Sequence, residues 1–486
     1  MSTTLIQHAE RVVAWDDSAD SHVYLRDADV VFEDNRFSFI GHGYSGPADT
    51  TVDGRGLMVM PGLVNIHCHP TSEPGNKGLL EELGSPRLGQ SSLYEFMPVF
   101  RIPPEAAWPA TQVAVAELLK SGVTTLTDLS GYREDWAEQL AATGIRGVLC
   151  PMYRSATWAT RNGHSVEYTW DEAAGERAMQ QALDCIDAAS KHPSGRMSGM
   201  VGPAQLDTCT EDLLKNSLAE ARRRDIPLQI HAAQSVVEFN EIMQRHGKTP
   251  VEFLDSLGLL GPDTIIGHGI FLNDHPWLHR PHHRDFERLA ASGAAVAHCP
   301  TVFCRRGIAL NTLGRYRQAG ITMGMGTDTF PHNFIDEMRN AAYMGRVLAG
   351  DYAAVSTRDV FMAATVGGAR ALKRADLGRV RVGEKADFSL VDLGHPSMQP
   401  GREPLRALIY SASDRPVRDV YVDGVQVVAG GEVTTIDLEP ALAALNEAQR
   451  ASIAGVTERD WAGRSIEQMT PMVFPEHLGP RRTEDR

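Results

Sequence analysis

The stretch PGLVNIHCHP (61–70) marks the point at which the sequence changes from one pattern to another. Before it, short runs of Val, Tyr and Phe at a spacing of two residues alternate with Asp, Asn and Gly, which predicts a small β element. From Leu63 onward, apolar runs of strand length alternate with stretches of helical periodicity. This stretch therefore separates a terminal β segment from a larger α/β unit.

Eight apolar runs in the α/β unit have the composition of buried parallel strands. They cover residues 63–67, 123–129, 145–151, 197–203, 228–231, 264–268, 294–300 and 321–328. Helical stretches lie between most of them, for example 109–122 and 210–225. Eight strand–helix repeats predict a TIM (β/α)8 barrel. In that fold the C-terminal ends of the strands meet at one mouth, which holds the active site.

β structure is predicted again after the barrel. Residues 377–393 and 417–437 have strand patterns, and Asp423-Gly424 is a hairpin signal. The two terminal β segments can therefore pair into one composite β-sandwich, with the barrel inserted between them. The predicted organisation is a first part of the sandwich over 1–61, the barrel over 62–373, the second part of the sandwich over 374–437, and a C-terminal helix and tail over 438–486.

Composition narrows the functional classes. The chain of 486 residues carries a formal net charge of −15, which argues against nucleic-acid binding because phosphate contacts need a surplus of Lys and Arg. No window of eighteen apolar residues and no secretory signal is present, so we expect neither a membrane partner nor export. Six Cys without a CxxC pair favour a reducing cytoplasm over a disulfide-bonded protein.

Metal-type ligands stand at four of the eight predicted strand ends. They are His67 and His69 after the first strand, His231 after the fifth, His268 after the sixth and Asp328 after the eighth. Residues i and i+2 of a strand share a face, so the HxH pair points both imidazoles the same way. A lone His at a strand end is usually structural, but this coincidence favours one centre for Zn²⁺ or Fe²⁺.

These motifs resemble those of the amidohydrolase superfamily, in particular its branch of cytosine, guanine and triazine deaminases and chlorohydrolases. The similar segments are PGLVNIHCHP (61–70), IHAAQ (230–234), IGHGIFL (266–272), VAHCPTVF (296–303), GMGTD (324–328) and LGRVRVGEKADFSLVDL (377–393). They occur in the family's order over residues 20–435. The resemblance implies metal ligands His67, His69, His231 and Asp328, and a catalytic role for His268.

The resemblance also has implications for metal number and assembly. Members with two ions bridge them with a carboxylated Lys at the end of the fourth strand, and residues 197–209 contain no Lys. We therefore expect one divalent ion per chain, Zn²⁺ with Fe²⁺ as the alternative. Family habit favours a homodimer or homotetramer.

The predicted chemistry is attack of a metal-activated water on an sp² carbon of a small molecule. Asp328 would take the proton of the water, and His268 would hold the developing oxyanion and help to protonate the leaving group. At one position the chain departs from the deaminases that it resembles: they carry Glu where this chain has Gln234. The amide of Gln cannot relay a proton as a carboxyl group can.

Gln234 leaves three functions open. The preferred one is hydrolysis of a non-peptide C–N bond of amide, lactam, urea or carbamate type in a cyclic or aromatic molecule. The alternative is deamination or hydrolytic dechlorination of a pyrimidine, purine or s-triazine. A non-catalytic scaffold is the second alternative, although such relatives usually lose ligands that this chain keeps.

Five residues are candidates for contact with the substrate: Gln234, Tyr94, His164, Phe330 and His332. Tyr94 lies in the long loop after the first strand and could roof an aromatic substrate or belong to the core of a lid. His164 follows the third strand and could equally be a surface residue. Phe330 and His332 follow the eighth strand, where bulky side chains would reshape the pocket.

Overall fold

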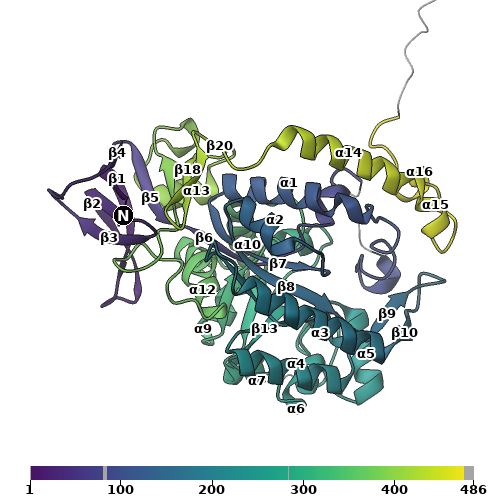
Figure 1. The fold of residues 1–486 in the computed structure, drawn as a ribbon. Helices are drawn as coiled ribbons and strands as arrows, with labels where there is room; N and C mark the ends of the chain where they lie inside the picture. The colour runs from purple at the N-terminus through teal and green to yellow at the C-terminus, as the bar shows by residue number, and fades with distance from the viewer. Residues whose placement is uncertain (1, 80–84, 283, 476–486) are drawn as a thin grey trace, which may run out of the picture.

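The computed structural model describes residues 2–79, 85–282 and 284–475, and eight parallel strands form its central barrel (Figure 1). These strands are β6 (Leu63–Cys68), β7 (Val123–Ser130), β8 (Arg146–Tyr153), β11 (Met197–Gly199), β13 (Leu228–Ala232), β14 (Thr264–His268), β15 (Ala295–His298) and β16 (Thr322–Met325). Their order is β11-β8-β7-β6-β16-β15-β14-β13. The N–H of Gln229 donates to the carbonyl of Val201 at 2.9 Å and closes the ring. The predicted TIM barrel is confirmed.

Helices follow the strands around the outside of the barrel. They include α1 (Ala107–Lys120), α2 (Trp136–Ala142), α3 (Glu172–Ala189), α4 (Glu211–Arg224), α5 (Val236–His246), α6 (Pro250–Ser256), α7 (Asp285–Ser292), α9 (Leu313–Gln318), α10 (Phe334–Ala349), α11 (Thr357–Met362) and α12 (Gly368–Ala371). Helix α4 shows why these segments are helical. Thr210 caps its first turn by accepting from the N–H of Leu213, and its last turn carries three Arg that suit the helix dipole.

The two ends of the chain meet in a second sheet. It contains β1 (Thr3–Asp16), β2 (Ser21–Glu33), β3 (Arg36–Gly41), β4 (Thr50–Asp53), β5 (Leu57–Pro61), β17 (Phe388–Asp392), β18 (Val417–Val422), β19 (Val425–Ala429) and β20 (Glu432–Val433). The N- and C-terminal parts join where β5 pairs antiparallel with β17. The predicted pairing of the termini is confirmed, and the strands of both segments form one continuous nine-stranded sheet, because this junction continues the hydrogen bonding from one segment into the other.

The C-terminal segment returns to the barrel. Helix α14 (Leu438–Ala454) lies along α1 (Figure 1), and Ala441 and Leu445 pack against Ala110 and Val113. The short helices α15 (Val456–Arg459) and α16 (Ile466–Met469) follow, whereas residues 476–486 of the predicted tail lie outside the described residues. Within the described ranges, no helix combines the length and the apolar character needed to cross a membrane.

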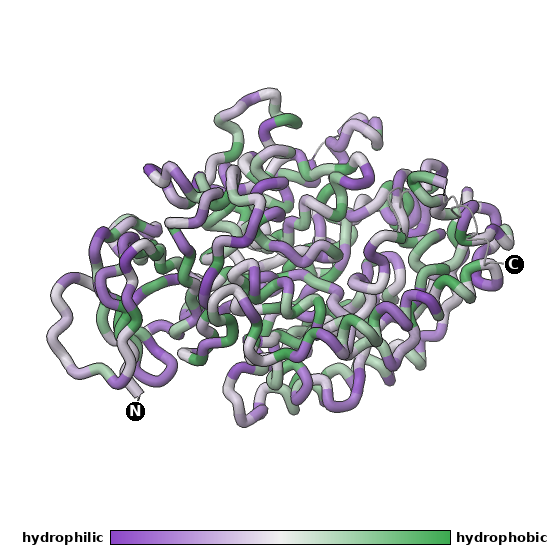
Figure 2. The backbone as a smooth tube through the Cα atoms, turned by 90° about the horizontal axis from the view of Figure 1, so that it is seen from above, coloured by the Kyte–Doolittle hydropathy of each residue, from purple (hydrophilic) through white to green (hydrophobic). Residues whose placement is uncertain are grey.

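Hydrophobic stretches recur along the backbone through the body of the molecule (Figure 2). They supply the buried side chains between the barrel strands and the surrounding helices, which form one large core. A separate, smaller core that includes Ile6, Phe32, Phe37 and Phe388 lies within the terminal sheet. The larger core also contains side chains of the terminal sheet, such as Met60, Val391 and Val420, so it packs that sheet against the barrel.

A buried ion-pair cluster fastens the terminal sheet to the barrel. Arg146, at the start of β8, is 0% exposed and donates from Nε to Asp387 Oδ2 at 2.7 Å and from Nη2 to Asp423 Oδ1 at 2.9 Å. Removing one partner of a buried pair leaves an uncompensated charge, so Arg146→Met should lower the free energy of unfolding by about 3–5 kcal/mol. Urea-unfolding curves of the variant and the wild type measure this loss.

Arg161 provides the matched control for that prediction. Its Nε lies 3.1 Å from Glu167 Oε2, but the Arg161 side chain is 80% exposed. A solvent-exposed pair contributes about 0–1 kcal/mol, so Arg161→Met should leave the urea midpoint nearly unchanged. Equal midpoints for the Arg146 and Arg161 variants would contradict a structural role for the buried cluster.

Candidate metal centre and active site

Backbone pairing brings the predicted ligands of the first and eighth strands together. The N–H of Asp328 donates to the carbonyl of His67, and the N–H of His69 donates to the carbonyl of Asp328, both at 2.9 Å. Asp328 has a φ of 58°, a left-handed conformation that Asp tolerates better than most residues. His231 lies in β13, which pairs in parallel with β14, whose last residue is His268. The five side chains therefore meet at the C-terminal mouth of the barrel.

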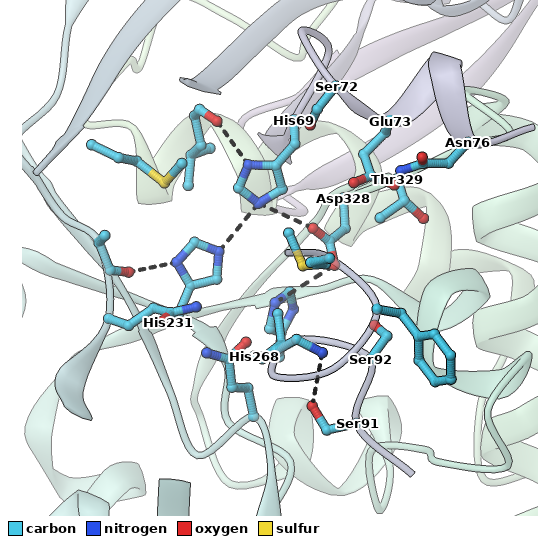
Figure 3. A pocket seen from close by; sticks show the side chains of 18 of the residues that line it. His69, Ser72, Glu73, Asn76, Ser91, Ser92, His231, His268, Asp328 and Thr329 are labelled. Carbon is cyan, nitrogen blue, oxygen red and sulfur yellow. Dashed lines mark hydrogen bonds and ion pairs between the residues drawn. The ribbon is translucent and has the colours of Figure 1, made fainter. Parts of the chain in front are cut away.

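The distances between the ligand atoms fit one metal ion. His69 Nε2 lies 3.3 Å from His231 Nε2 and 3.2 Å from Asp328 Oδ1 (Figure 3), and His67 Nε2 lies 3.5 Å from the same oxygen. A tetrahedral site with bonds of about 2.0–2.1 Å has edges of about 3.3–3.4 Å. His268 is slightly farther away, with Nε2 at 3.7 Å from Asp328 Oδ2.

Hydrogen bonds behind the rings of His69 and His231 fix their orientation. His69 Nδ1 lies 2.7 Å from the carbonyl of Leu129, and His231 Nδ1 lies 2.6 Å from the carbonyl of Ala204. A carbonyl only accepts, so each Nδ1 carries the hydrogen and each Nε2 presents a lone pair. Two Nε2 atoms 3.3 Å apart, each on a ring fixed from behind, suit a cation bound between them.

His67 is held in the same way at the floor of the site. Its Nδ1 is hydrogen-bonded to Gln229 Oε1, and the Gln229 Nε2 donates to the carbonyl of Ile66 at 2.8 Å, which fixes the amide. His67 Nε2 is buried and has no hydrogen-bond partner in the described part of the chain. A buried polar atom normally has a partner, so the atom fits the role of a metal ligand. His67, His69, His231 and Asp328 are the residues that would hold the ion.

The charge state of the site suits metal binding. Burial lowers the pKa of His231 and of His268 well below the usual histidine value, so both rings are neutral at pH 7. Burial opposes ionisation of Asp328, but His268, His67 and His69 hold its pKa well below its usual range. These two imidazoles and this carboxylate are in the forms that bind Zn²⁺. Burial lowers the pKa of His69, but the neighbouring Asp328 and Glu73 outweigh it and raise that pKa above its usual value.

A cavity of about 280 Å³ opens above these ligands. Its polar or charged lining includes His69, Glu73, Arg154, His231, Gln234, His268, Arg306 and Asp328, and its apolar lining includes Leu93, Phe96, Met97, Phe100, Trp158, Phe303 and Ile308. Burial raises the pKa of Glu73, against the opposing charges of His69, Arg306 and Arg305. An apolar cavity with few convergent polar groups is typical of a site for a small molecule.

Gln234 faces this cavity, as predicted from its position three residues after His231. The Glu238 carboxylate accepts from the N–H groups of Ala233 and Gln234 at 2.8 and 2.9 Å and fixes the loop. The Gln234 Nε2 is buried without a partner among the described residues. The amide is therefore free to bind a group that enters the cavity.

Tyr94 and His164, predicted to contact the substrate, are not among the residues that line the cavity. Tyr94 is 1% exposed, and its hydroxyl lies 3.3 Å from both Asp207 Oδ2 and Ser235 Oγ, so its polar atom is satisfied within the protein. His164 is exposed, and its Nε2 lies 2.8 Å from a guanidinium nitrogen of Arg87. Both predictions are corrected because neighbouring loops already occupy these side chains.

Phe330 and His332 also lie outside the lining of the cavity. The Phe330 ring packs under the guanidinium of Arg305 at 4.3 Å. His332 is fully buried, and its Nδ1 lies 3.4 Å from Thr327 Oγ1 and 3.6 Å from Cys68 Sγ. Thr329 still lines the cavity, whereas the side chains of Phe330 and His332 pack against other parts of the protein.

The buried position of His332 predicts a pH effect on stability. Burial lowers its pKa from 6.5 to about 4, so between these values the unfolded chain binds a proton that the folded chain does not. This histidine therefore destabilises the fold progressively as the pH falls from 6.5 towards 4. Between pH 7 and 5, the unfolding free energy of His332→Gln should fall by about 2 kcal/mol less than that of the wild type. Urea unfolding at both pH values measures the difference, and an equal fall in the two proteins would contradict it.

Gln229 and Glu73 were not predicted from the sequence, and for Arg306, next to Arg305, the sequence favours a solvated loop residue over a ligand of a substrate carboxylate. Gln229 could have been found, since it precedes His231 by two residues and so shares its face of the strand. Glu73 and Arg306 lie in loops after β6 and β15, whose course has no periodic signal. Their positions follow from the packing of the loops around the mouth.

Comparison with known proteins agrees with this site. Residues 58–427 match the model of the amidohydrolase family. The chain is 32% identical over 432 residues to a 5-methylthioadenosine/S-adenosylhomocysteine deaminase of Natronomonas pharaonis, covering 88% of this chain and 93% of that protein. It is 29% identical to a 5'-deoxyadenosine deaminase of Methanosarcina acetivorans, covering 91% and 96%.

Solved structures share the fold. An adenosine deaminase from Xanthomonas campestris with bound zinc superposes with a TM-score of 0.77 at 23% identity, covering 93% of this chain and 98% of that one. Atrazine chlorohydrolase from Arthrobacter aurescens, in complex with zinc, has a TM-score of 0.77 at 22% identity, covering 92% and 100%. The resemblance and the fold class predicted from the sequence are both confirmed. The chain belongs to the amidohydrolase family, and it is a hydrolase that acts on carbon–nitrogen bonds.

Proposed function

We propose that this protein removes an amino group from a nitrogen heterocycle of the aminopurine class and releases ammonia. The observation that carries the proposal is the convergence of His67, His69, His231 and Asp328 under a cavity of small-molecule size. The relatives that are 29–32% identical over most of the chain are deaminases of adenine nucleosides. The preference for amide-type substrates, drawn from Gln234 alone, therefore gives way to the heterocycle alternative.

The residues of the chain have separate tasks in this reaction. The four ligands would hold a divalent ion, and such an ion would supply an acidified water, whose pKa falls from about 16 towards 7. Asp328 accepts the proton of the attacking water, whose oxygen adds to the ring carbon that bears the amino group. His268 Nε2 lies 3.7 Å from Asp328 Oδ2, and its buried Nδ1 has no partner among the described residues. His268 can therefore stabilise the negative charge that develops on the attacking oxygen.

Gln234 positions the substrate in this proposal. Its unpartnered amide can donate to, or accept from, a ring nitrogen or an exocyclic group of the heterocycle. Since an amide does not exchange protons, Gln234 also favours a second candidate function, which is displacement of a group that needs no proton, such as chloride. Hydrolysis of an amide, lactam, urea or carbamate, whose departing amine does need a proton, is grouped with this candidate only because it too releases no ammonia from a heterocycle.

The proposal includes one zinc ion per chain, with iron as the alternative. No lysine is found among the described residues that line the cavity, so none there can form a carboxylated lysine that bridges two ions. The zinc in the related solved structures supports this metal. We also propose a cytoplasmic homodimer or homotetramer, on the strength of cysteine usage and family habit.

A substrate panel with zinc-reconstituted protein tests the proposed function. We expect ammonia from at least one of adenosine, 5'-deoxyadenosine, 5'-methylthioadenosine and S-adenosylhomocysteine, with kcat/KM of about 10⁴ M⁻¹ s⁻¹ or more. Chloride from a chlorotriazine, or amine from amides and ureas, without ammonia from any aminopurine would favour the second candidate. A protein that holds zinc but turns over no member of the panel would instead be a scaffold.

A further inference from the structure

The long segment between His69 and α1 supplies one side of the cavity. Its described parts, residues 70–79 and 85–106, have as regular elements three short 3-10 helices: η1 (Glu73–Asn76), η2 (Pro86–Leu88) and η3 (Pro104–Ala106). Four apolar side chains of this segment line the cavity, and they are called the apolar wall here: Leu93, Phe96, Met97 and Phe100. A segment with so little regular backbone pairing depends on contacts with the rest of the chain for its position.

The C-terminal helix α14 holds the first part of this segment. Gln449, on α14, donates from its Nε2 to the carbonyls of Gly75 and Lys77, both at 2.8 Å. Gly75 belongs to η1, and Lys77 follows that helix directly. The contact therefore ties α14 to the stretch of chain that comes directly after the candidate metal ligand His69.

A buried carboxylate ties the apolar wall itself to the C-terminal segment. Glu95 is 7% exposed, and its Oε1 accepts from Trp461 Nε1 at 3.1 Å and from Arg464 Nη2 at 2.8 Å. The same nitrogen of Arg464 lies 2.6 Å from Asp460 Oδ1, which fixes the guanidinium from the other side. Because Glu95 directly precedes Phe96, these contacts fix the backbone from which the Phe96 ring enters the cavity.

Apolar packing reinforces the attachment. Arg459 Nε donates to the carbonyl of Val99 at 2.7 Å. A small buried core, separate from the core of the barrel, contains side chains of both segments: Leu79, Val99, Phe100 and Val456, with Phe96, Ile453, Ile466 and Met469 packed against them. Phe96 and Phe100 take part in this core and also line the cavity. The C-terminal segment thus reaches the active site through these two rings.

We propose that the C-terminal segment 449–464 determines substrate specificity by positioning the apolar wall. Glu95 and Arg464 are positioning residues, because neither is among the described residues that line the cavity. They act through the side chains of the wall, to which the C-terminal segment is tied by the contacts of Glu95 and by the small core.

The chemistry of the apolar wall indicates the class of substrate, and this part of the inference rests on the proposed function. The ring carbon under attack has to lie at the metal ligands, so the rest of an aminopurine nucleoside extends towards the remaining lining of the cavity. Apolar side chains favour an apolar group, whereas a hydroxyl buried against them would lose its hydrogen bonds to water. The preferred substrate is therefore an aminopurine nucleoside with an apolar substituent, such as a methylthio group, on its sugar.

Amide hydrogen exchange tests the positioning role without any substrate. Arg464→Met removes the cation that pairs with Glu95 but keeps a long side chain, so the amides of residues 93–100 should exchange at least about tenfold faster than in the wild type. The control is Arg450→Met on α14, which removes a 67% exposed cation that pairs with Glu447. Zinc content should be unchanged in both variants. Equal protection of residues 93–100 in the two variants would overturn the positioning role.

Steady-state kinetics with two substrates tests the effect on specificity. In Arg464→Met, KM for 5'-methylthioadenosine should rise about tenfold with kcat within about twofold of the wild type, because the metal ligands are untouched and only binding of the apolar substituent is weakened. KM for adenosine should change less than about threefold. Glu95→Ala should match Arg464→Met, and the double variant should be no worse than either, since all three remove the same contact. Glu95→Gln keeps an accepting oxygen and should stay within about threefold of the wild type.

The possible failures are distinguishable. Equal changes in KM for the two substrates, or a fall in kcat with KM unchanged, would overturn the effect on specificity and leave the proposed function standing. A wild type that releases no ammonia from any aminopurine would overturn the proposed function and the substrate class with it. The exchange of residues 93–100 would then still decide whether the C-terminal segment positions the apolar wall.

Discussion

Replacing Asp328 by Asn should lower kcat/KM at least about 10³-fold, the largest loss expected from a substitution that keeps the shape of a side chain. The carboxylate has two tasks, as a ligand within 3.2–3.5 Å of two imidazole nitrogens and as the acceptor of the proton from the attacking water. An amide has a weaker ligand oxygen and does not accept a proton at neutral pH. Steady-state rates on the best aminopurine of the panel measure the loss.

A second Asp→Asn variant shows whether the loss of one negative charge alone lowers the rate. Asp184 is an exposed carboxylate on α3, and Asp184→Asn should retain the wild-type rate. The thermal midpoint of Asp328→Asn should stay close to that of the wild type when both are measured without metal. Full activity in Asp328→Asn would remove this residue from the reaction and with it the proposed role in water activation.

Replacing His67 by Ala should remove the metal as well as the activity. The His67 ring is 0% exposed, its Nδ1 is fixed by Gln229, and Gly267 lies so close that an added Cβ would come within 2.8 Å of the ring. We expect zinc below about 0.1 equivalent per chain after gel filtration, and kcat/KM lowered by about 10³-fold or more.

His164→Ala provides the comparison, because this His is exposed and does not line the cavity. It should retain both zinc and rate. A His67→Ala protein that keeps a full equivalent of zinc would show that the ion binds elsewhere, whereas one that keeps the rate without zinc would show that the reaction does not depend on this centre.

The barrel and its metal ligands could be predicted from the sequence because two periodicities determine them. Apolar runs of strand length separated by helices define the barrel, and barrel closure brings every strand end to one mouth. His67 and His69 then share a face through their i, i+2 spacing. The same i, i+2 rule places Gln229 on the face of its strand that carries His231, and this is the residue whose side chain hydrogen-bonds to His67.

The loops around the mouth could not be predicted in this way. Tyr94 was expected to face a substrate, but its hydroxyl meets Asp207 and Ser235, which come from two other loops. Such contacts depend on how segments more than a hundred residues apart pack together. The local sequence pattern around Tyr94 therefore does not predict them. The junction of the two terminal segments is another non-local contact, since β5 pairs with β17, a strand from the other end of the chain.

Anomalous diffraction from crystals of zinc-reconstituted protein is the most direct test of the central claim, which is that one ion is bound at the barrel mouth. The account predicts a single zinc peak per chain, about 2.0–2.2 Å from the Nε2 atoms of His67, His69 and His231 and from an oxygen of Asp328. Two peaks at the mouth, or no peak among these four side chains in protein that is active, would contradict it.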